Sequence, residues 1–181
     1  MTPLALASRS ADETRRIGEI IGGELRSGDV VLLHGDLGAG KTTLTQGIAR
    51  GLGVADYVQS PTFTLVGEHA GRGADGEEIA LHHLDLYRLD DVVELESFGY
   101  DQYLDPIGAV SVIEWPERAG DWLPDRYLLV ELIADGGDRR RFRLSSPPSD
   151  ERGKATIRRI AERIAERLAS ESPPPLDEAR N

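Results

Sequence analysis

Residues 29–43 read DVVLLHGDLGAGKTT, and this segment constrains the architecture of the chain more strongly than any other. Residues 29–34 are a continuous β-branched and apolar run, which is typical of a strand buried on both faces in a parallel sheet. Residues 44–53, LTQGIARGLG, have helical spacing and a glycine stop. The segment therefore predicts a strand, a glycine loop and a helix in direct succession.

The glycine loop matches the phosphate-binding pattern G-x-x-x-x-G-K-[ST]. Its glycines let several backbone N–H groups turn toward one centre, and the following helix directs its positive N-terminal end to the same place. Lys41 is expected to bridge β- and γ-phosphate oxygens, and Thr42 to offer its hydroxyl to Mg²⁺. The loop residues predicted to bind the nucleotide are Gly35, Asp36, Leu37, Gly38, Ala39, Gly40, Lys41, Thr42 and Thr43.

A magnesium–nucleotide site also needs an acidic side chain at the end of a neighbouring buried strand. Glu114 ends the apolar run AVSVIEW at 109–115, and Asp85 lies within HLDLYR at 83–88. Glu114 is expected at the carboxyl edge of its strand, where ligands bind in open α/β sheets. Asp85 alternates with leucines, so a one-sided strand could place it outside the site. A surface position stays open for both carboxylates at this point.

Two further segments have two interpretations each. The loop SPTFT at 60–64 could sense a γ-phosphate through its hydroxyls, as switch loops do, but a plain turn before a strand is favoured. The arginines Arg139, Arg140, Arg141 and Arg143 could bind phosphate, but a solvated face or a charged edge strand is favoured. Guanine recognition usually needs Asn-Lys-x-Asp, and because the single asparagine is Asn181, ATP is the expected nucleotide.

Composition bounds the class of protein. The chain has 181 residues, within the usual one-domain length, and its 39% hydrophobic content is enough for a core. It carries 32 acidic and 21 basic residues with no block of Lys and Arg, so strong direct nucleic-acid binding is not expected. The absence of cysteine excludes disulfides, thiolate nucleophiles and Cys-ligated zinc. No run approaches the roughly 18 apolar residues of a membrane span, and a cytoplasmic location is expected.

Other patterns predict the remaining elements. Ser10 and Glu13 form a capping box before a helix over 11–26. Residues 62–70 and 79–87 form one expected hairpin, and a second surrounds Gly136 and Gly137. A short helix is expected from a cap at Asp90 to Ser97, and a longer one over 150–169 from a cap at Ser149, with an apolar stripe of Ile157, Ile160, Ile164 and Leu168.

These elements predict a single α/β three-layer domain of the P-loop type. The sheet is expected to be mainly parallel with antiparallel additions from the two hairpins, and helices are expected on both faces. The ATPase domain is assigned to residues 1–146. Residues 147–170 are expected to form an amphipathic helix packed on or appended to that domain, and residues 171–181 a disordered tail.

Four segments together resemble one family. They are GDLGAGKTT at 35–43, SPTFTL at 60–65, HLDLYRL at 83–89 and IEWPER at 113–118. In their order, spacing and residues, these segments are similar to the TsaE (YjeE) family of bacterial tRNA threonylcarbamoyladenosine biosynthesis. The resemblance covers about residues 10–145, and a generic P-loop would explain only the first segment.

The resemblance implies a small P-loop ATPase that joins TsaB and TsaD. In that family TsaC makes threonylcarbamoyl-adenylate, and TsaD transfers the threonylcarbamoyl group to N6 of the adenosine next to the anticodon in ANN-decoding tRNAs. TsaE hydrolyses ATP to permit repeated turnover. By resemblance Lys41 and the loop amides hold phosphates, Thr42 and Glu114 organise Mg²⁺, and Asp85 supports hydrolysis.

The resemblance also gives roles to residues outside the loop. Thr62 is implied as a switch-like catalytic hydroxyl, Trp115 as a residue close to the nucleotide, and Thr14 as a residue near the adenine. Arg88 is the candidate arginine finger, and we expect slow hydrolysis that TsaB–TsaD stimulates. Two rival functions stay open: a small-molecule kinase, and a nucleotide-switched binding module in which hydrolysis is incidental.

Overall fold

A seven-stranded sheet organises the computed structural model, which describes residues 2–73 and 75–171. The strands are β1 (Leu4–Ser8), β2 (Val30–His34), β3 (Val66–Arg72), β4 (Glu78–Asp85), β5 (Ala109–Glu114), β6 (Leu128–Ala134) and β7 (Arg140–Ser145). The helices are α1 (Ala11–Glu24), α2 (Lys41–Gly51), α3 (Val93–Ser97) and α4 (Glu151–Glu171), with short 3₁₀ helices η1 (Tyr100–Tyr103) and η2 (Pro116–Ala119). The strand order is β1-β7-β6-β2-β5-β4-β3.

The four central strands, β6, β2, β5 and β4, are parallel to one another. The pairs β3–β4 and β6–β7 are antiparallel, which confirms both predicted hairpins. Strand β1, which the sequence did not predict, pairs with β7. The interpretation of the arginine-rich β7 as an edge strand was therefore wrong, because β1 covers it.

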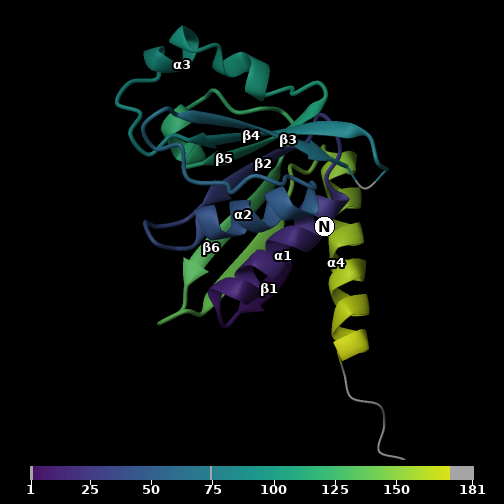
Figure 1. Cartoon of the computed structure of the whole chain (residues 1–181). Coiled ribbons are helices and arrows are strands. Elements are labelled where there is room, and N and C mark those ends of the chain that lie inside the picture. The colour runs from purple at the N-terminus through teal and green to yellow at the C-terminus, as the bar shows by residue number, and fades with distance from the viewer. Residues whose placement is uncertain (1, 74, 172–181) are drawn as a thin grey trace, which may run out of the picture.

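The molecule has three layers (Figure 1), as predicted. Helices α1, α2 and α4 lie on one face of the sheet, and α3 lies across the other. Alternate residues of β2 point to the two faces: Val31 and Leu33 join the core that includes α1 and α2, whereas Val30 and Leu32 join the core under α3. Burial of this strand on both faces is confirmed.

Glycine permits the close packing of α1 on α2. A Cβ atom on Gly22 would lie 2.2 Å from the carbonyl oxygen of Ile48, which is too close for any side chain. Its neighbour Gly23 has open space around its Cβ position. The helix therefore tolerates Gly22, despite its low helix propensity, because only glycine fits there.

Three expected caps differ in detail. The Ser10 hydroxyl accepts from the Glu13 N–H at 3.1 Å as predicted, but the Glu13 carboxylate accepts from the N–H of Arg9. Asp91, not Asp90, accepts from the first turn of α3. At α4 the carboxylate of Asp150 accepts from Gly153, so the cap expected at Ser149 was wrong. At α3 and α4 two adjacent polar residues could cap, and sequence alone does not choose between them.

The first hairpin is shorter than expected. Residues before Val66 form a turn, in which the N–H groups of Thr64 and Leu65 both donate to the carbonyl of Pro61. Leu65 has a φ of 63°, which takes the chain out of an extended conformation. The segment 60–65 is therefore a loop that leads into β3.

Helix α4 packs on the rest of the structure. Ile157 and Ile160 are buried in the same core as Ile21, and Arg159 and Arg163 form ion pairs with Glu24 at 3.0 and 3.2 Å. Of the expected tail over 171–181, Glu171 is the last residue of α4, and residues 172–181 lie outside the described residues, as does the Leu168 side chain. Across the described ranges, no helix is both long and apolar enough to cross a bilayer.

Candidate active site

A cleft of about 380 Å³ lies where β4 and β5 end and α2 begins, and its volume is in the range of small-ligand sites. These elements meet there because the parallel strands place their carboxyl ends at one edge of the sheet. The residues that line the cleft are Leu37, Gly38, Gly40, Lys41, Thr42, Thr43, Ser60, Thr62, Asp85, Tyr87, Glu114, Trp115 and Arg140. Segments distant in sequence therefore share one site.

The glycine loop opens the N-terminus of α2 toward this cleft. Gly40 is the N-cap residue with a φ of 103°, a conformation that favours glycine, and no side chain caps the helix. The first N–H groups of an α-helix have no partner inside the helix and carry its positive end. The loop thus presents donors suited to an anion.

Lys41 is held at the base of the loop. Its ammonium group donates to the carbonyl oxygens of Gly35 at 2.6 Å and Asp36 at 2.9 Å, and it lies 3.7 Å from the centre of the Trp115 ring. Burial lowers the pKa of Lys41, while nearby carboxylates, Glu114 first among them, oppose that shift. The amine is therefore fixed in position next to an aromatic face rather than free in solvent.

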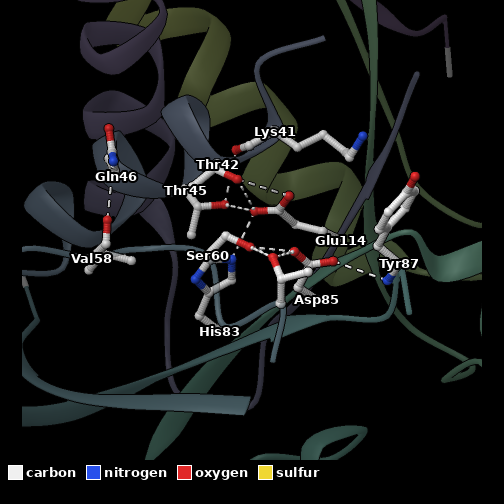
Figure 2. A network of polar contacts seen from close by, with 11 residues as sticks. Lys41, Thr42, Thr45, Gln46, Val58, Ser60, His83, Asp85, Tyr87 and Glu114 are labelled. Carbon is white, nitrogen blue, oxygen red and sulfur yellow. Dashed lines mark hydrogen bonds and ion pairs between the residues drawn. The ribbon is translucent and has the colours of Figure 1, made fainter. Parts of the chain in front are cut away.

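Glu114 gathers hydroxyl and imidazole donors (Figure 2). Its carboxylate accepts from Thr42 at 3.1 and 3.2 Å, from Thr45 at 3.3 Å, and lies 2.8 Å from Nε2 of His83. Only 2% of Glu114 is exposed, and His83 is fully buried. The structure thus brings the predicted pair Thr42 and Glu114 together and fixes the carboxylate from three sides.

Asp85 lies beside Glu114, since the two are register partners on β4 and β5. Its carboxylate accepts from the hydroxyl of Ser60 and from the N–H of Tyr87 at 3.0 Å (Figure 2). It also accepts from the hydroxyl of Thr62 at 3.0 Å. The loop 60–65 is therefore tied to the site through Asp85. A surface position for either carboxylate does not occur, because both side chains are at least 95% buried.

Sequence reasoning missed five residues of this site, namely Thr45, Ser60, His83, Tyr87 and Arg140. His83 precedes Asp85 by two positions on β4, so the two side chains share a face of the strand. This two-residue spacing was the signal in the sequence that could have placed His83 at the site. Ser60 lies two residues before Thr62 in the same loop, and Thr45 lies one helical turn after Lys41. Arg140 had no local signal that separated it from its neighbours.

Thr14 and Arg88 are not brought to the cleft, and the predicted loop residues Gly35, Asp36 and Ala39 do not line it. Thr14 is 1% exposed and shares a 2.8 Å hydrogen bond with the hydroxyl of Ser8, and it does not line the cleft. Arg88 is exposed, with its guanidinium 4.4 Å from the Phe63 ring centre, and it also lies outside the lining. Within the loop, Ala39 is buried in the main core.

Comparison with known proteins matches this arrangement to a family. The family model described as threonylcarbamoyl adenosine biosynthesis protein TsaE matches residues 8–142, which include every predicted site residue. The chain belongs to the TsaE family. The four segments that carried the resemblance all lie within the matched range.

Individual TsaE relatives are similar over most of their length. The tRNA threonylcarbamoyladenosine biosynthesis protein TsaE of Nostoc sp. strain PCC 7120 is 42% identical over 144 residues, covering 77% of this chain and 83% of the relative. The protein of the same name from Bacillus subtilis is 39% identical over 140 residues, covering 77% and 84%. The crystal structure of Bacillus subtilis YdiB aligns with a TM-score of 0.70 at 28% identity and covers 91% of this chain and 98% of YdiB.

Proposed function

We propose that this TsaE-family protein is an ATPase required for threonylcarbamoyladenosine modification of ANN-decoding tRNAs. It hydrolyses ATP to drive repeated turnover of a TsaB–TsaD complex. The observation that carries the proposal is the hydrogen bond from Thr42 to Glu114 inside a cleft that also holds Lys41 and Asp85. Its relatives are tRNA threonylcarbamoyladenosine biosynthesis proteins, which supports the same assignment.

The donor set fits Mg²⁺ bound with a nucleotide. Thr42 and Glu114 offer oxygen ligands, which Mg²⁺ prefers, and phosphates and waters usually supply the other ligands. Across residues 2–73 and 75–171, no group of three or more acidic or histidine side chains could hold a metal alone. We therefore assign the metal to Thr42 and Glu114 together with nucleotide phosphates.

Hydrolysis would depend on positioning and charge rather than on a covalent intermediate. Lys41 and the N–H groups at the start of α2 would bind phosphate oxygens, and Mg²⁺ would neutralise charge on the leaving oxygens. Asp85 would orient a water whose oxygen attacks the γ-phosphorus. The bond from that phosphorus to the β–γ bridging oxygen then breaks, which gives ADP and phosphate.

Two further residues have proposed roles at the same cleft. Thr62 hydrogen-bonds to Asp85, so movement of loop 60–65 would change the position of that carboxylate. Trp115 lies against Lys41 and lines the cleft, which supports a place next to the nucleotide. Thr14 has no such support, because it is buried away from the lining residues.

The cleft has exposed apolar side chains near its opening, which supports a protein partner there. Leu37 lines the cleft and is 74% exposed, and Phe63, next to Thr62, is 84% exposed. Contiguous exposed apolar patches commonly mark interaction surfaces, and in this proposal these two side chains contribute to one. The net charge of −11 disfavours direct binding of tRNA, so in this proposal the TsaB–TsaD complex holds the tRNA.

The direct test is phosphate release from ATP by the purified protein, alone and after addition of TsaB–TsaD. We expect slow release alone and faster release with the partners, with little activity on GTP. Equal rates with and without partners would contradict stimulation. Phosphate transferred to a small-molecule acceptor would instead support the kinase, and tRNA modification over many turnovers without hydrolysis would support the binding module.

A further inference from the structure

The arginines of β7 divide between the two faces of the sheet. Arg141 forms an ion pair with Asp135 at 3.2 Å, and Arg143 with Glu131 at 3.6 Å, and about 60% of each arginine side chain is exposed. Arg140 lies on the opposite face, which it shares with Phe142, a residue buried in the main core. Residue alternation along the strand thus separates Arg140 from its neighbours.

The Arg140 side chain crosses to the glycine loop. Its Nη2 donates to the carbonyl oxygen of Gly38 at 3.2 Å, over a separation of 102 residues. A Cβ atom added to Gly40 would lie 3.6 Å from Nε of Arg140, so the Arg140 side chain runs close to the loop. Strand β6, which precedes β7, also approaches the loop, since a Cβ atom on Gly35 would lie 2.5 Å from the carbonyl oxygen of Leu132.

Part of the hydrogen-bonding capacity of Arg140 is unused. A guanidinium group has five N–H donors. Nη1 donates to the carbonyls of Gly137 and Arg139 at 2.7 and 2.8 Å, and one N–H of Nη2 donates to Gly38. Among the residues that the structure describes, no carboxylate pairs with Arg140, in contrast to Arg141 and Arg143. The Nε–H and the second Nη2 N–H therefore remain for a ligand.

The charges that line the cleft indicate which ligand. Arg140 and Lys41 are its two cationic lining residues, and Asp85 and Glu114 its two anionic ones. A triphosphate adds several negative charges next to these carboxylates, so a second cation at the loop would strengthen its binding. Guanidinium N–H groups on Nε and Nη2 suit phosphate oxygens, which they can contact in pairs.

We propose that Arg140 is the second cation of the phosphate site and that it binds nucleotide phosphate oxygens from the β6–β7 hairpin. This inference rests on the proposed binding of ATP and adds a ligand-binding residue from a strand outside the glycine loop. Arg140 is therefore a cation supplied by the chain itself, whereas Arg88 lies outside the cleft lining.

The test is the dissociation constant of MgATP, measured by calorimetry on the full chain. Arg140→Ala should weaken ATP binding about tenfold to a hundredfold, the effect of losing charged hydrogen bonds. Arg141→Ala is the matched control, because its side chain is on the other face, and it should bind within about twofold of wild type. Thermal melting of each variant establishes that it is folded.

Two more variants separate a phosphate contact from a purely structural clamp on the Gly38 carbonyl. Arg140→Lys keeps the charge, whereas Arg140→Gln keeps N–H donors without charge, so phosphate binding predicts that Lys retains more affinity. Equal ATP affinity in folded Arg140 variants and wild type would overturn this inference but not the proposed function. Higher ATP affinity in Arg140→Gln than in Arg140→Lys would do the same. Failure of the wild-type protein to bind ATP would overturn the proposed function as well.

Discussion

The hydroxyl of Thr42 lies 3.1 and 3.2 Å from the two carboxylate oxygens of Glu114, although 72 residues separate them in the chain. The contact exists because β5 runs parallel to β2 and ends beside the start of α2. A hydroxyl and a carboxylate held this close can bind one magnesium ion between protein and phosphate. The same edge of the sheet brings Asp85 to the site.

Lys41→Ala is expected to abolish measurable ATP binding while the protein stays folded. The ammonium group is held at the base of the glycine loop, so in the proposed site its loss removes the phosphate contacts at that position. Calorimetric titration with MgATP measures the effect. Lys154→Ala, which changes the only other lysine, should bind ATP as wild type does; comparable binding by Lys41→Ala would contradict the role of the loop.

Glu114→Gln and Asp85→Asn are expected to retain nucleotide binding but to lose hydrolysis by about a hundredfold or more, the usual range for a lost positioning or proton-accepting group. Both variants keep the shape of a buried side chain and remove its charge. Phosphate release at saturating ATP measures the loss. Glu117→Gln is a suitable control, since Glu117 is partly exposed and neutralising it leaves Glu114 intact. Near-normal rates in both site variants would refute the assignment.

His83→Ala is expected to raise the Mg²⁺ concentration needed for half-maximal hydrolysis and to lower the free energy of unfolding by about 1–3 kcal/mol. His83 acts through Glu114, which loses a 2.8 Å hydrogen bond in a buried site. The adjacent His82 packs against Tyr103 instead, so His82→Ala should leave the Mg²⁺ requirement unchanged. A loss of stability without any change in Mg²⁺ requirement would show that His83 is only structural.

Gly22→Ala is expected to destabilise the protein by about 1–3 kcal/mol, because the added methyl group would overlap the Ile48 carbonyl oxygen between α1 and α2. Gly23→Ala has open space and should be neutral or stabilising by up to about 1 kcal/mol, since alanine favours helix. Chemical denaturation of the two variants measures the difference. Equal stabilities would mean that the two helices are not packed this closely.

The central part of the fold and of the site could be predicted because short local sequence patterns determine it. The β2 run, the glycine loop and the start of α2 are contiguous, so one segment defines a strand, a loop and a helix. Glu114 was predictable from its place at the end of an apolar strand, since parallel strands end at one edge. For Asp85 the spacing was ambiguous, and the resemblance to the TsaE family gave it weight.

The remaining features depend on contacts between distant segments. Nothing local shows that β1 pairs with β7, and without that pairing the three arginines of β7 look alike. The register of β7 alone turns Arg140 toward the glycine loop. Thr14 was placed near the adenine by resemblance only, and its side chain is buried against Ser8. Local patterns identify chemical groups, whereas packing decides which of them meet.

The most direct measurement is the number of modified tRNAs formed per TsaB–TsaD complex in a reconstituted reaction with threonylcarbamoyl-adenylate. Wild-type protein with MgATP should give many modified tRNAs per complex. Asp85→Asn, which is expected to bind ATP without hydrolysing it, should give about one. Many turnovers at the wild-type rate with Asp85→Asn, despite absent hydrolysis, would contradict the proposal that these carboxylates serve an ATP hydrolysis cycle that drives the modification.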